Sequence, residues 1–365
     1  MSDTELKPLH PREAMEMWLD RQRSERAEET LQSYFYRLNT FVEWCEENGF
    51  DNLNDLTGRD MFKYDSHRRS LDLSQSTLNN QLGTLRQFIS FCADIEAVDS
   101  ELPLKVDVPQ LTKKDRTNEE KLSTERAEVL LEDLKRYRRA SRDHALFLLA
   151  WHTCARLGGL RSLDVQDCYL SEDDLERLRH QDDVDDEILE EVSIPFIYFR
   201  HRSSTPLKNQ EEGERPVAIS EEVADFLDEY IRVNRVAGRD EDGREPLFST
   251  KKGEGRMTKG ALRSRMNIMT QPCRFGHGCP HGREIESCEA RRSPYESRCP
   301  SSRSPHRVRT GAITHHLDCG WPIEQLAERV NATPQVIRDH YDQPDLLKRM
   351  ESRRSHLDRL DGEDE

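Results

Sequence analysis

The sequence predicts a mainly α protein of the α+β class, with one small β-sheet and two domains. Two amphipathic stripes of apolar residues at helical spacing lie in the first hundred residues, where no strand is needed. Later in the chain, one pair of alternating segments predicts two short strands. A length of 365 residues is sufficient for two separate cores.

The first predicted domain covers residues 1–101. Its two strong helices begin near residue 30 and residue 76, and weaker helical segments at 10–22 and 57–68 complete a four-helix domain. The first stripe consists of Leu31, Tyr34, Phe35, Leu38, Phe41, Val42 and Cys45, and the second of Leu78, Leu82, Leu85, Phe88, Ile89 and Cys92.

A linker is predicted at residues 102–121, because this stretch has two prolines, a basic cluster and no periodicity. The second domain is expected over 122–345, followed at 346–365 by an amphipathic helix and an acidic end. Its strands are expected at 192–198 and 215–219, on either side of a polar turn. Its helices are expected at 123–137, 142–160, 220–236, 309–319, 322–330 and 334–341.

The acidic net charge and the low lysine content indicate which kind of protein this is. The net charge is −16, and arginine supplies 43 of the 55 basic residues. An acidic, lysine-poor surface is typical of a halophilic protein, in which salt screens the repulsion, although an ordinary acidic cytosolic protein remains the alternative. No apolar run is long enough to span a membrane, so we expect a soluble cytoplasmic protein.

Four of the nine cysteines fall in one segment rich in Pro, Gly and Arg, residues 273–299. Thiolates in such a loop can hold a structural zinc ion that supplies the order which packing cannot. The spacing matches no common zinc-finger pattern, so a loop with incidental cysteines is the alternative. The predicted zinc ligands are Cys273, Cys279, Cys288 and Cys299, with His277 and His281 as alternates.

Five residues, taken in chain order, supply what cutting and rejoining a DNA strand without ATP or metal requires. The reaction needs a nucleophile that keeps the phosphate bond energy, cations that stabilise the charged transition state, and an acid that protonates the leaving 5′ oxygen. The candidates are Arg156 and Arg309 for the phosphate, Lys208 as the acid, His306 as acid or base, and Tyr341 as nucleophile.

Three sequence boxes resemble those of the tyrosine recombinase or phage integrase family, including its Xer-like and haloarchaeal members. The segment "TCARLGGLRSLDVQD" is similar to the first arginine box and places Arg156 and Asp167 on family positions. The segment "LKNQEEGERPVAI" resembles the hairpin with its lysine, and "HRVR" resembles the His-x-Leu-Arg box. The final family tyrosine corresponds to Tyr341.

This resemblance implies an N-terminal four-helix, SAM-like core-binding domain and a mostly helical catalytic domain. It also implies double-stranded DNA as partner, a homo-oligomer on DNA, and no cofactor for catalysis. The function expected is a site-specific DNA recombinase or integrase that acts through a 3′-phosphotyrosyl intermediate.

Two positions depart from the family pattern. Gly159 replaces a glutamate that follows the first arginine, so Asp164 or Asp167 is expected to take over as its partner. Ala332 stands where the family has a histidine, and its side chain can neither donate nor accept a hydrogen bond. The site then acts slowly, uses Asn331 or His340 instead, or belongs to an inactive DNA-binding regulator. A type IB-like topoisomerase is a further alternative.

Overall fold

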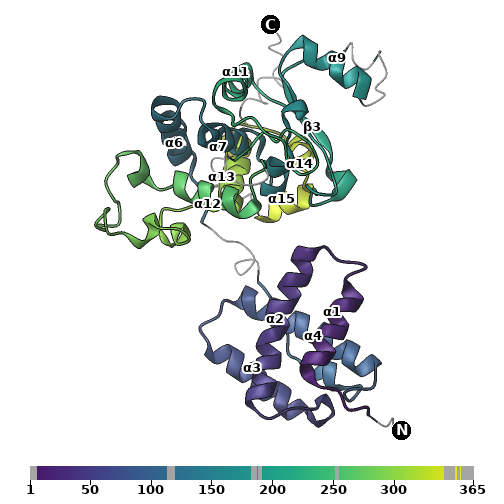
Figure 1. Ribbon diagram of the computed structural model, residues 1–365. Coiled ribbons are helices and arrows are strands. Elements are labelled where there is room, and N and C mark those ends of the chain that lie inside the picture. Colours follow the sequence, from purple (N-terminus) through teal and green to yellow (C-terminus); the bar gives the residue numbers. More distant parts are fainter. Residues whose placement is uncertain are drawn as a thin grey trace. The chain divides into compact units, whose positions relative to one another are not determined.

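The computed structural model describes residues 6–112, 120–181, 187, 191–250, 255–340, 350, 351 and 354. Contacts divide the chain into two compact units, Met1–Asn118 and Glu119–Glu365 (Figure 1). Each unit has its own apolar core.

Four helices form the N-terminal unit, as the apolar stripes predicted. Three of them begin at side-chain caps. The His10 side chain accepts a hydrogen bond from Arg12 N, Thr57 and Asp60 form a capping box, and Ser74 accepts from Thr77 N. The helices are α1 (Pro11–Gln22), α2 (Glu28–Glu47), α3 (Gly58–Ser70) and α4 (Gln75–Asp94).

Aromatic side chains fill the centre of this unit. Phe41 lies edge-on to Tyr64 with ring centroids 5.1 Å apart, and both rings are buried. The first residues of the segment expected as a linker, 102–106, belong to the N-terminal unit instead. Leu102 and Val106 are buried in this core, and Leu102–Lys105 forms a 3₁₀ turn, because apolar side chains gain more from burial than from a solvated linker.

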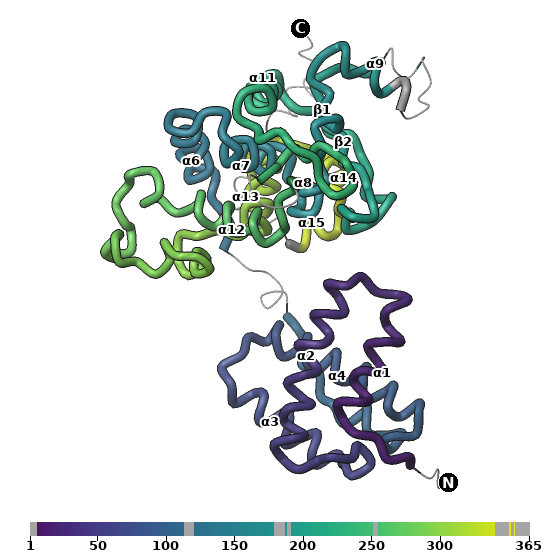
Figure 2. Tube along the Cα trace, viewed as in Figure 1, coloured from purple at the N-terminus to yellow at the C-terminus, as the bar shows by residue number. Residues whose placement is uncertain are grey.

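The second unit is mainly helical and contains the small sheet. Its helix α13 lies against α7 and α14 (Figure 2). Gly311 allows the chain at Leu122 to lie close to α13, because a Cβ at position 311 would come within 2.0 Å of the Leu122 carbonyl oxygen. The helices are α6 (Thr124–Tyr137), α7 (Arg142–Thr153), α8 (Leu157–Ser162), α9 (Glu172–Gln181), α11 (Glu221–Glu229) with a π-helical turn at Tyr230–Asn234, α12 (Lys259–Met269), α13 (Pro305–Asp318), α14 (Ile323–Val330) and α15 (Pro334–His340).

The sheet has three antiparallel strands in the order β1-β2-β3. The strands are β1 (Cys168–Tyr169), β2 (Phe196–Phe199) and β3 (Arg215–Ala218). The register pairs Ile197 with Val217 and Phe199 with Arg215. The predicted hairpin is therefore present, and the mainly α fold class with a small sheet is confirmed, whereas the two-residue strand β1 was not expected.

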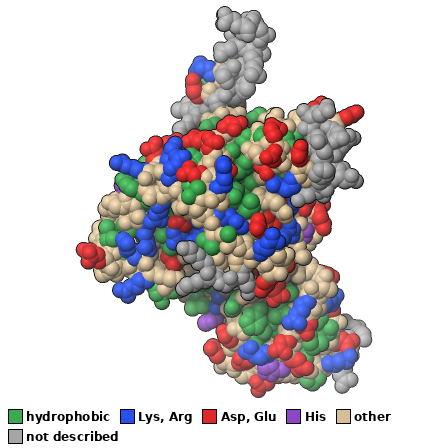
Figure 3. Space-filling view, turned by 45° about the horizontal axis from the view of Figure 1, so that its top comes forward, with side chains coloured by type: hydrophobic (Ala, Val, Ile, Leu, Met, Phe, Trp, Pro, Cys, Tyr) green, Lys and Arg blue, Asp and Glu red, His purple; other side chains and the backbone are tan. Residues whose placement is uncertain are grey.

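No helix in the described part of the chain is long and apolar enough to cross a membrane. Figure 3 shows basic and acidic side chains interspersed over the face in view. The described surface therefore shows no large area of a single charge on this face.

Candidate functional site

Arg156 lies where the chain turns between two helices. The sequence predicted one helix over 142–160, but α7 ends at Thr153 and α8 begins at Leu157. Cys154 has a left-handed backbone with φ of 52°, which cannot continue a right-handed helix. Arg156 is consequently the N-cap residue of α8, and its Nη1 donates to the carbonyl oxygen of Asn331 at 2.7 Å.

Arg309 is buried in the second turn of α13, with 2% of its surface exposed. A buried guanidinium requires hydrogen-bond partners to offset its lost hydration. Its Nη1 donates to the carbonyl oxygen of Cys154 at 2.5 Å, and its Nη2 donates to that of Val330 at 2.9 Å. Arg309 therefore joins the end of α7 to the end of α14.

Three arginines from three different elements meet at the C-terminal end of α14. The last carbonyl groups of a helix lack intrahelical partners and carry partial negative charge, so they attract cations. Here they bind guanidinium groups from β3, α13 and the start of α8. The pairs are Arg215 Nε with Arg329 O at 2.7 Å, Arg309 Nη2 with Val330 O at 2.9 Å, and Arg156 Nη1 with Asn331 O at 2.7 Å.

Arg215 was not among the residues predicted for the site. Burial and the neighbouring charges of Arg309 and Arg156 lower its pKa to about 9. Its guanidinium lies over the ring of Phe199, 4.7 Å from the centroid. An arginine at the start of a short strand, directly after the lysine turn, is the signal that could have drawn attention to it.

Lys208 lies in the turn between β2 and β3, with an exposed side chain. Partial burial lowers its pKa, and so do the charges of Arg156 and Arg309. The predicted lysine therefore lies within the electrostatic field of both predicted arginines, although about 50 and 100 residues separate them along the chain.

His306 is the second residue of α13 and lies one helical turn before Arg309, with an exposed side chain. Tyr341 follows the last residue of α15 and lies outside the described residues, as do Leu346 and Leu347 of the predicted C-terminal helix. Among the predicted catalytic residues, the structure therefore brings Arg156, Lys208 and Arg309 together.

Comparisons with known proteins bear on the fold and the family. Residues 16–94 match the family described as phage integrase, N-terminal SAM-like domain. The Tn1549 transposon integrase in complex with a circular intermediate DNA has a similar structure, with a TM-score of 0.63 and 14% identity over 96% of this chain and 99% of that one. The chain belongs to the phage integrase, or tyrosine recombinase, family.

Other solved recombinases also resemble this family member. The XerH site-specific recombinase bound to difH matches with a TM-score of 0.59 and 16% identity, over 95% of this chain and 84% of that one. The N-terminal domain of a phage integrase/site-specific recombinase from Haloarcula marismortui is 39% identical over 28% of this chain and 99% of that one, with a TM-score of 0.28. A comparison with curated proteins finds no match.

Ala332, at the family's histidine position, is partly buried and packs against the second core. The side chain of Asn331, one of the expected substitutes, already has two hydrogen-bond partners in the turn that follows Lys208. Its Oδ1 accepts from Asn209 Nδ2 at 2.5 Å, and its Nδ2 donates to the Glu212 carbonyl oxygen at 2.9 Å. The side chain of the other substitute, His340, lies outside the described residues.

Gly159 occupies a position where a larger residue such as the family's glutamate would be tightly packed. A Cβ at this position would lie 3.3 Å from the ring of Phe199, which is buried. The aspartates expected as partners of Arg156 instead bind other arginines. Asp167 Oδ1 lies 2.6 Å from Arg202 Nη2, and Asp164 pairs with Arg256. Burial raises the pKa of Asp167, and the hydrogen bond from Arg202 opposes that shift.

In the structure, the cysteine-rich loop, which is described throughout, shows no grouping of the four cysteines that were predicted as zinc ligands. All four cysteines are free and partly exposed. His277 Nε2 lies 2.7 Å from Asp133 Oδ2, and His281 Nε2 lies 2.7 Å from Ser301 Oγ, so both imidazoles have protein partners. Within the described residues, no three side chains of His, Cys, Asp or Glu form a group that could hold a metal ion.

Hydrogen bonds from buried side chains hold this loop in place. Gln271 Nε2 donates to the carbonyl oxygens of Ala290 at 3.3 Å and Glu296 at 2.9 Å. Arg126 Nη2 donates to those of Thr270 at 3.0 Å and Ser301 at 2.9 Å. The loop is thereby connected to α6 and to the end of α12.

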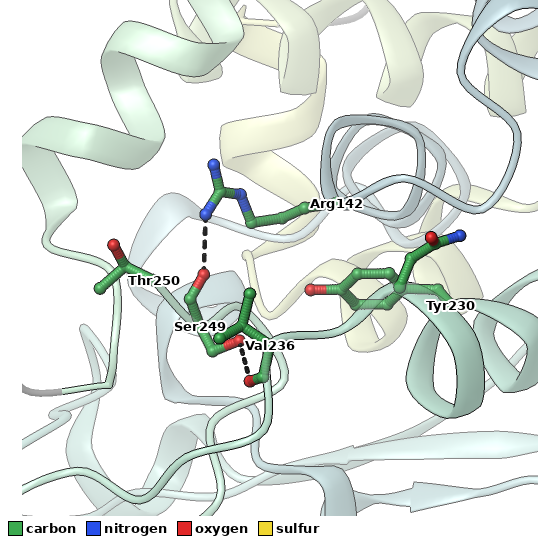
Figure 4. A pocket seen from close by; sticks show the side chains of 6 residues that line it. Arg142, Tyr230, Val236, Ser249 and Thr250 are labelled. Carbon is green, nitrogen blue, oxygen red and sulfur yellow. Dashed lines mark hydrogen bonds between the residues drawn. The ribbon is translucent and has the colours of Figure 1, made fainter. Parts of the chain in front are cut away.

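A separate cavity of about 310 Å³ lies at the other end of α7 (Figure 4). In it, Arg142 Nη1 donates to the Ser249 carbonyl oxygen at 2.8 Å, and Ser249 Oγ donates to Val236 O at 2.6 Å. Arg142 is the first residue of α7, and a helix of 12 residues is about 18 Å long. The cavity is therefore not part of the arginine cluster.

Proposed function

We propose that this family member is a site-specific DNA recombinase or integrase, a strand transferase that cuts and rejoins DNA. One observation carries the proposal. Arg156 and Arg309, distant in sequence, meet at the C-terminal end of α14, and partial burial together with the charges of both lowers the pKa of Lys208. Two fixed guanidinium groups and one lysine with a lowered pKa are suited to phosphoryl transfer.

In the proposed reaction, Tyr341 Oη attacks the phosphorus atom of a phosphodiester. A phosphorus–oxygen bond to the tyrosine forms, the bond to the 5′ oxygen breaks, and a 3′-phosphotyrosyl intermediate results. Lys208 Nζ transfers a proton to the leaving 5′ oxygen, and His306 accepts the phenolic proton. The same steps in reverse, with a new 5′ hydroxyl as nucleophile, rejoin the strand without any cofactor.

Arg156 and Arg309 stabilise the additional negative charge that develops on the non-bridging oxygens in the transition state. Removing one such donor from an active site typically lowers the rate by about 10²–10³-fold. Lys208 contributes a factor on the order of 10²–10⁴ as general acid.

Double-stranded DNA is the proposed substrate and partner, with several copies of the chain acting on paired sites. The Tn1549 integrase was solved with transposon DNA, and lambda integrase was solved as a dimer bound to a core site. The net charge of −16 opposes long-range attraction to DNA. Contact with phosphates then depends on local arginines such as those of the cysteine-rich loop.

A catalytically inactive DNA-binding regulator is the second candidate, and Ala332 favours it because one phosphate-binding side chain of the family is missing. A DNA duplex with a nick next to the cleavage site separates the two. After cleavage the short fragment that carries the new 5′ hydroxyl diffuses away, so the covalent adduct accumulates. We expect an adduct that Tyr341→Phe abolishes, at low or at molar salt.

Binding without any adduct at both salt concentrations would identify the protein as a regulator. Relaxation of supercoiled plasmid without a defined site would instead indicate a topoisomerase. Matched binding curves for the wild type and Tyr341→Phe show that the variant still reaches its DNA.

A structural zinc ion in the loop 273–299 stays a prediction from cysteine spacing alone. Metal analysis of the purified chain tests it. A content of about one zinc ion per chain, lost in Cys288→Ser, supports the metal site. A zinc content well below one per chain contradicts the prediction.

A further inference from the structure

We propose that Asn331 and Arg215 are positioning residues that fix the turn of Lys208 against the two phosphate-binding arginines. This inference rests on the proposed function and adds to it the device that orients the general acid. Asn331 was considered in the sequence only as a substitute for the family histidine, and Arg215 only as part of the hairpin box, so neither was assigned a positioning role.

The Asn331 amide binds the lysine turn at two points. It accepts a hydrogen bond from Asn209 Nδ2 at 2.5 Å, directly after Lys208 in sequence. It also donates to the carbonyl oxygen of Glu212 at 2.9 Å, four residues after Lys208. Both groups of one planar amide are thereby engaged, so the turn is held at both ends of its 3₁₀ segment, Gln210–Gly213.

Arg215 binds the same turn from the strand that follows it. Its Nη1 donates to the Gly213 carbonyl oxygen at 2.9 Å, while its Nε donates to Arg329 O in α14 at 2.7 Å. Arg329 in return donates from Nη1 to the carbonyl oxygen of Ala218 in β3 at 2.8 Å. The hairpin and the end of α14 are therefore connected in both directions.

The backbone of Asn331 connects this contact to the phosphate site. Asn331 is in the left-handed conformation, with φ of 50°, which asparagine tolerates better than most residues. Its carbonyl oxygen accepts from Arg156, while its side chain holds the neighbour of Lys208. One residue thus fixes the distance between a transition-state cation and the turn that carries the acid.

This arrangement matters because a lysine in a surface turn has four flexible side-chain bonds. A general acid acts only when its proton lies within hydrogen-bond distance of the leaving oxygen. Holding the backbone of the turn removes most of the conformations that place Nζ elsewhere, and such preorganisation raises the rate. Loss of the contacts is expected to impair proton transfer to the 5′ oxygen and to leave phosphate binding unchanged.

The test uses the full-length protein with Asn209→Ala and with Asn331→Gly. Glycine adopts the left-handed backbone without strain, so Asn331→Gly removes only the side chain. Glu211→Gln, at an exposed position of the same turn, is the matched control. Adduct formation is measured on two nicked duplexes, one with a normal 5′ oxygen and one with sulfur in its place. A thiolate leaves without being protonated, so cleavage of the sulfur substrate does not need the general acid.

On the oxygen substrate we expect each asparagine variant to react about tenfold more slowly, which corresponds to the loss of one or two hydrogen bonds. On the sulfur substrate both variants react like the wild type, and the control is unaffected on either. Lys208→Ala gives the same pattern with a larger deficit. Equal losses on both substrates, or no loss on either, would overturn the proposal.

Hydrogen exchange of the DNA-free protein supplies a readout independent of catalysis. Amides of residues 209–214 are expected to exchange faster in both asparagine variants, and those of α7 are expected to remain unchanged. If the wild type forms no adduct on either substrate, the proposed reaction fails while faster exchange still supports the structural contact. Unchanged exchange together with normal adduct formation removes the contact itself.

Discussion

Arg309 donates to the carbonyl oxygen of Cys154 at 2.5 Å, and this bond joins the core helix α13 to the turn that presents Arg156. The turn exists because Cys154 adopts a left-handed backbone. The guanidinium group of Arg309 is therefore both a phosphate-binding candidate and a structural connection. The two roles lead to different expectations for the two arginines.

Arg309→Ala is expected to lower both activity and stability. The substitution leaves two buried carbonyl groups without donors, and we expect the free energy of unfolding to fall by about 1–3 kcal/mol. Arg156 is only half-buried, so Arg156→Ala is expected to cost less than about 1 kcal/mol. Urea denaturation at fixed salt measures the difference, and both variants are expected to lose about 10²–10³-fold in adduct formation. Equal stability losses would contradict the structural role of Arg309.

The alkaline limb of the pH–rate profile is expected to report Lys208. A general acid must be protonated, so the rate falls as pH rises through its pKa. Burial and the charges of Arg156 and Arg309 lower that pKa, so the fall is expected at a lower pH than an ordinary lysine gives. The limb is expected to disappear on the sulfur substrate and in Lys208→Arg, whose rate on the oxygen substrate is low throughout. An unchanged limb in Lys208→Arg would assign it to another group.

The buried His144 and the half-buried His152 are expected to make the second unit sensitive to acid. Burial lowers the pKa of His144 and of His152 to about 4, and the Nδ1 of His144 accepts from Ala140 N at 3.3 Å. A base with a lowered pKa in the folded state stabilises the protein above its unfolded pKa of about 6.5. This contribution is lost as pH falls from about 6.5 towards 4.

Denaturant midpoints over that pH range measure the effect. A loss on the order of 1–3 kcal/mol is expected by pH 4. His144→Gln is expected to flatten the dependence, because the amide oxygen can still accept the hydrogen bond but does not titrate. The exposed His67→Gln is the control, and an identical slope in both variants would show that His144 is not responsible.

Gly311→Ala tests the close packing of α13. A Cβ there would come within 2.0 Å of the Leu122 carbonyl oxygen and 3.1 Å of the Trp151 ring, so the backbone would have to move. We expect a loss of about 3 kcal/mol or more in unfolding free energy. Gly260→Ala is the control, at an exposed position of α12 where a Cβ would make only an ordinary contact, 3.8 Å from Thr258 Oγ1; it is expected to be neutral or stabilising by about 0.5–1 kcal/mol. A small effect at Gly311 would mean that α13 packs less closely.

The helices with strong apolar stripes were predictable from the sequence, and α2 and α4 begin within two residues of the expected positions. The break at Cys154 was not, because cysteine gives no local signal for a left-handed backbone and the apolar pattern continues through it. Helices α9 and α12 were missed as well. Polar residues dominate α9, whose position is set by contacts with β1 rather than by an apolar stripe of its own.

The candidate site was predictable in part. Resemblance to the family identified Arg156, Lys208 and Arg309, and the structure brings these three together. The roles of Arg215 and Asn331 could not be predicted, because they depend on hydrogen bonds to residues more than 100 positions away along the chain. The zinc site stays a prediction, since cysteine spacing alone does not show which way four thiols point.

The binding of three guanidinium groups by backbone carbonyls has a consequence for the effect of salt on this site. Ion pairs weaken when a dense ionic atmosphere surrounds the protein, whereas a hydrogen bond to a helix end acts over one atomic contact and is shielded far less. Molar potassium chloride would therefore slow the association with DNA without changing the orientation of the three arginine side chains. The geometry of the three arginines is thus expected to persist in salt while the affinity for DNA declines.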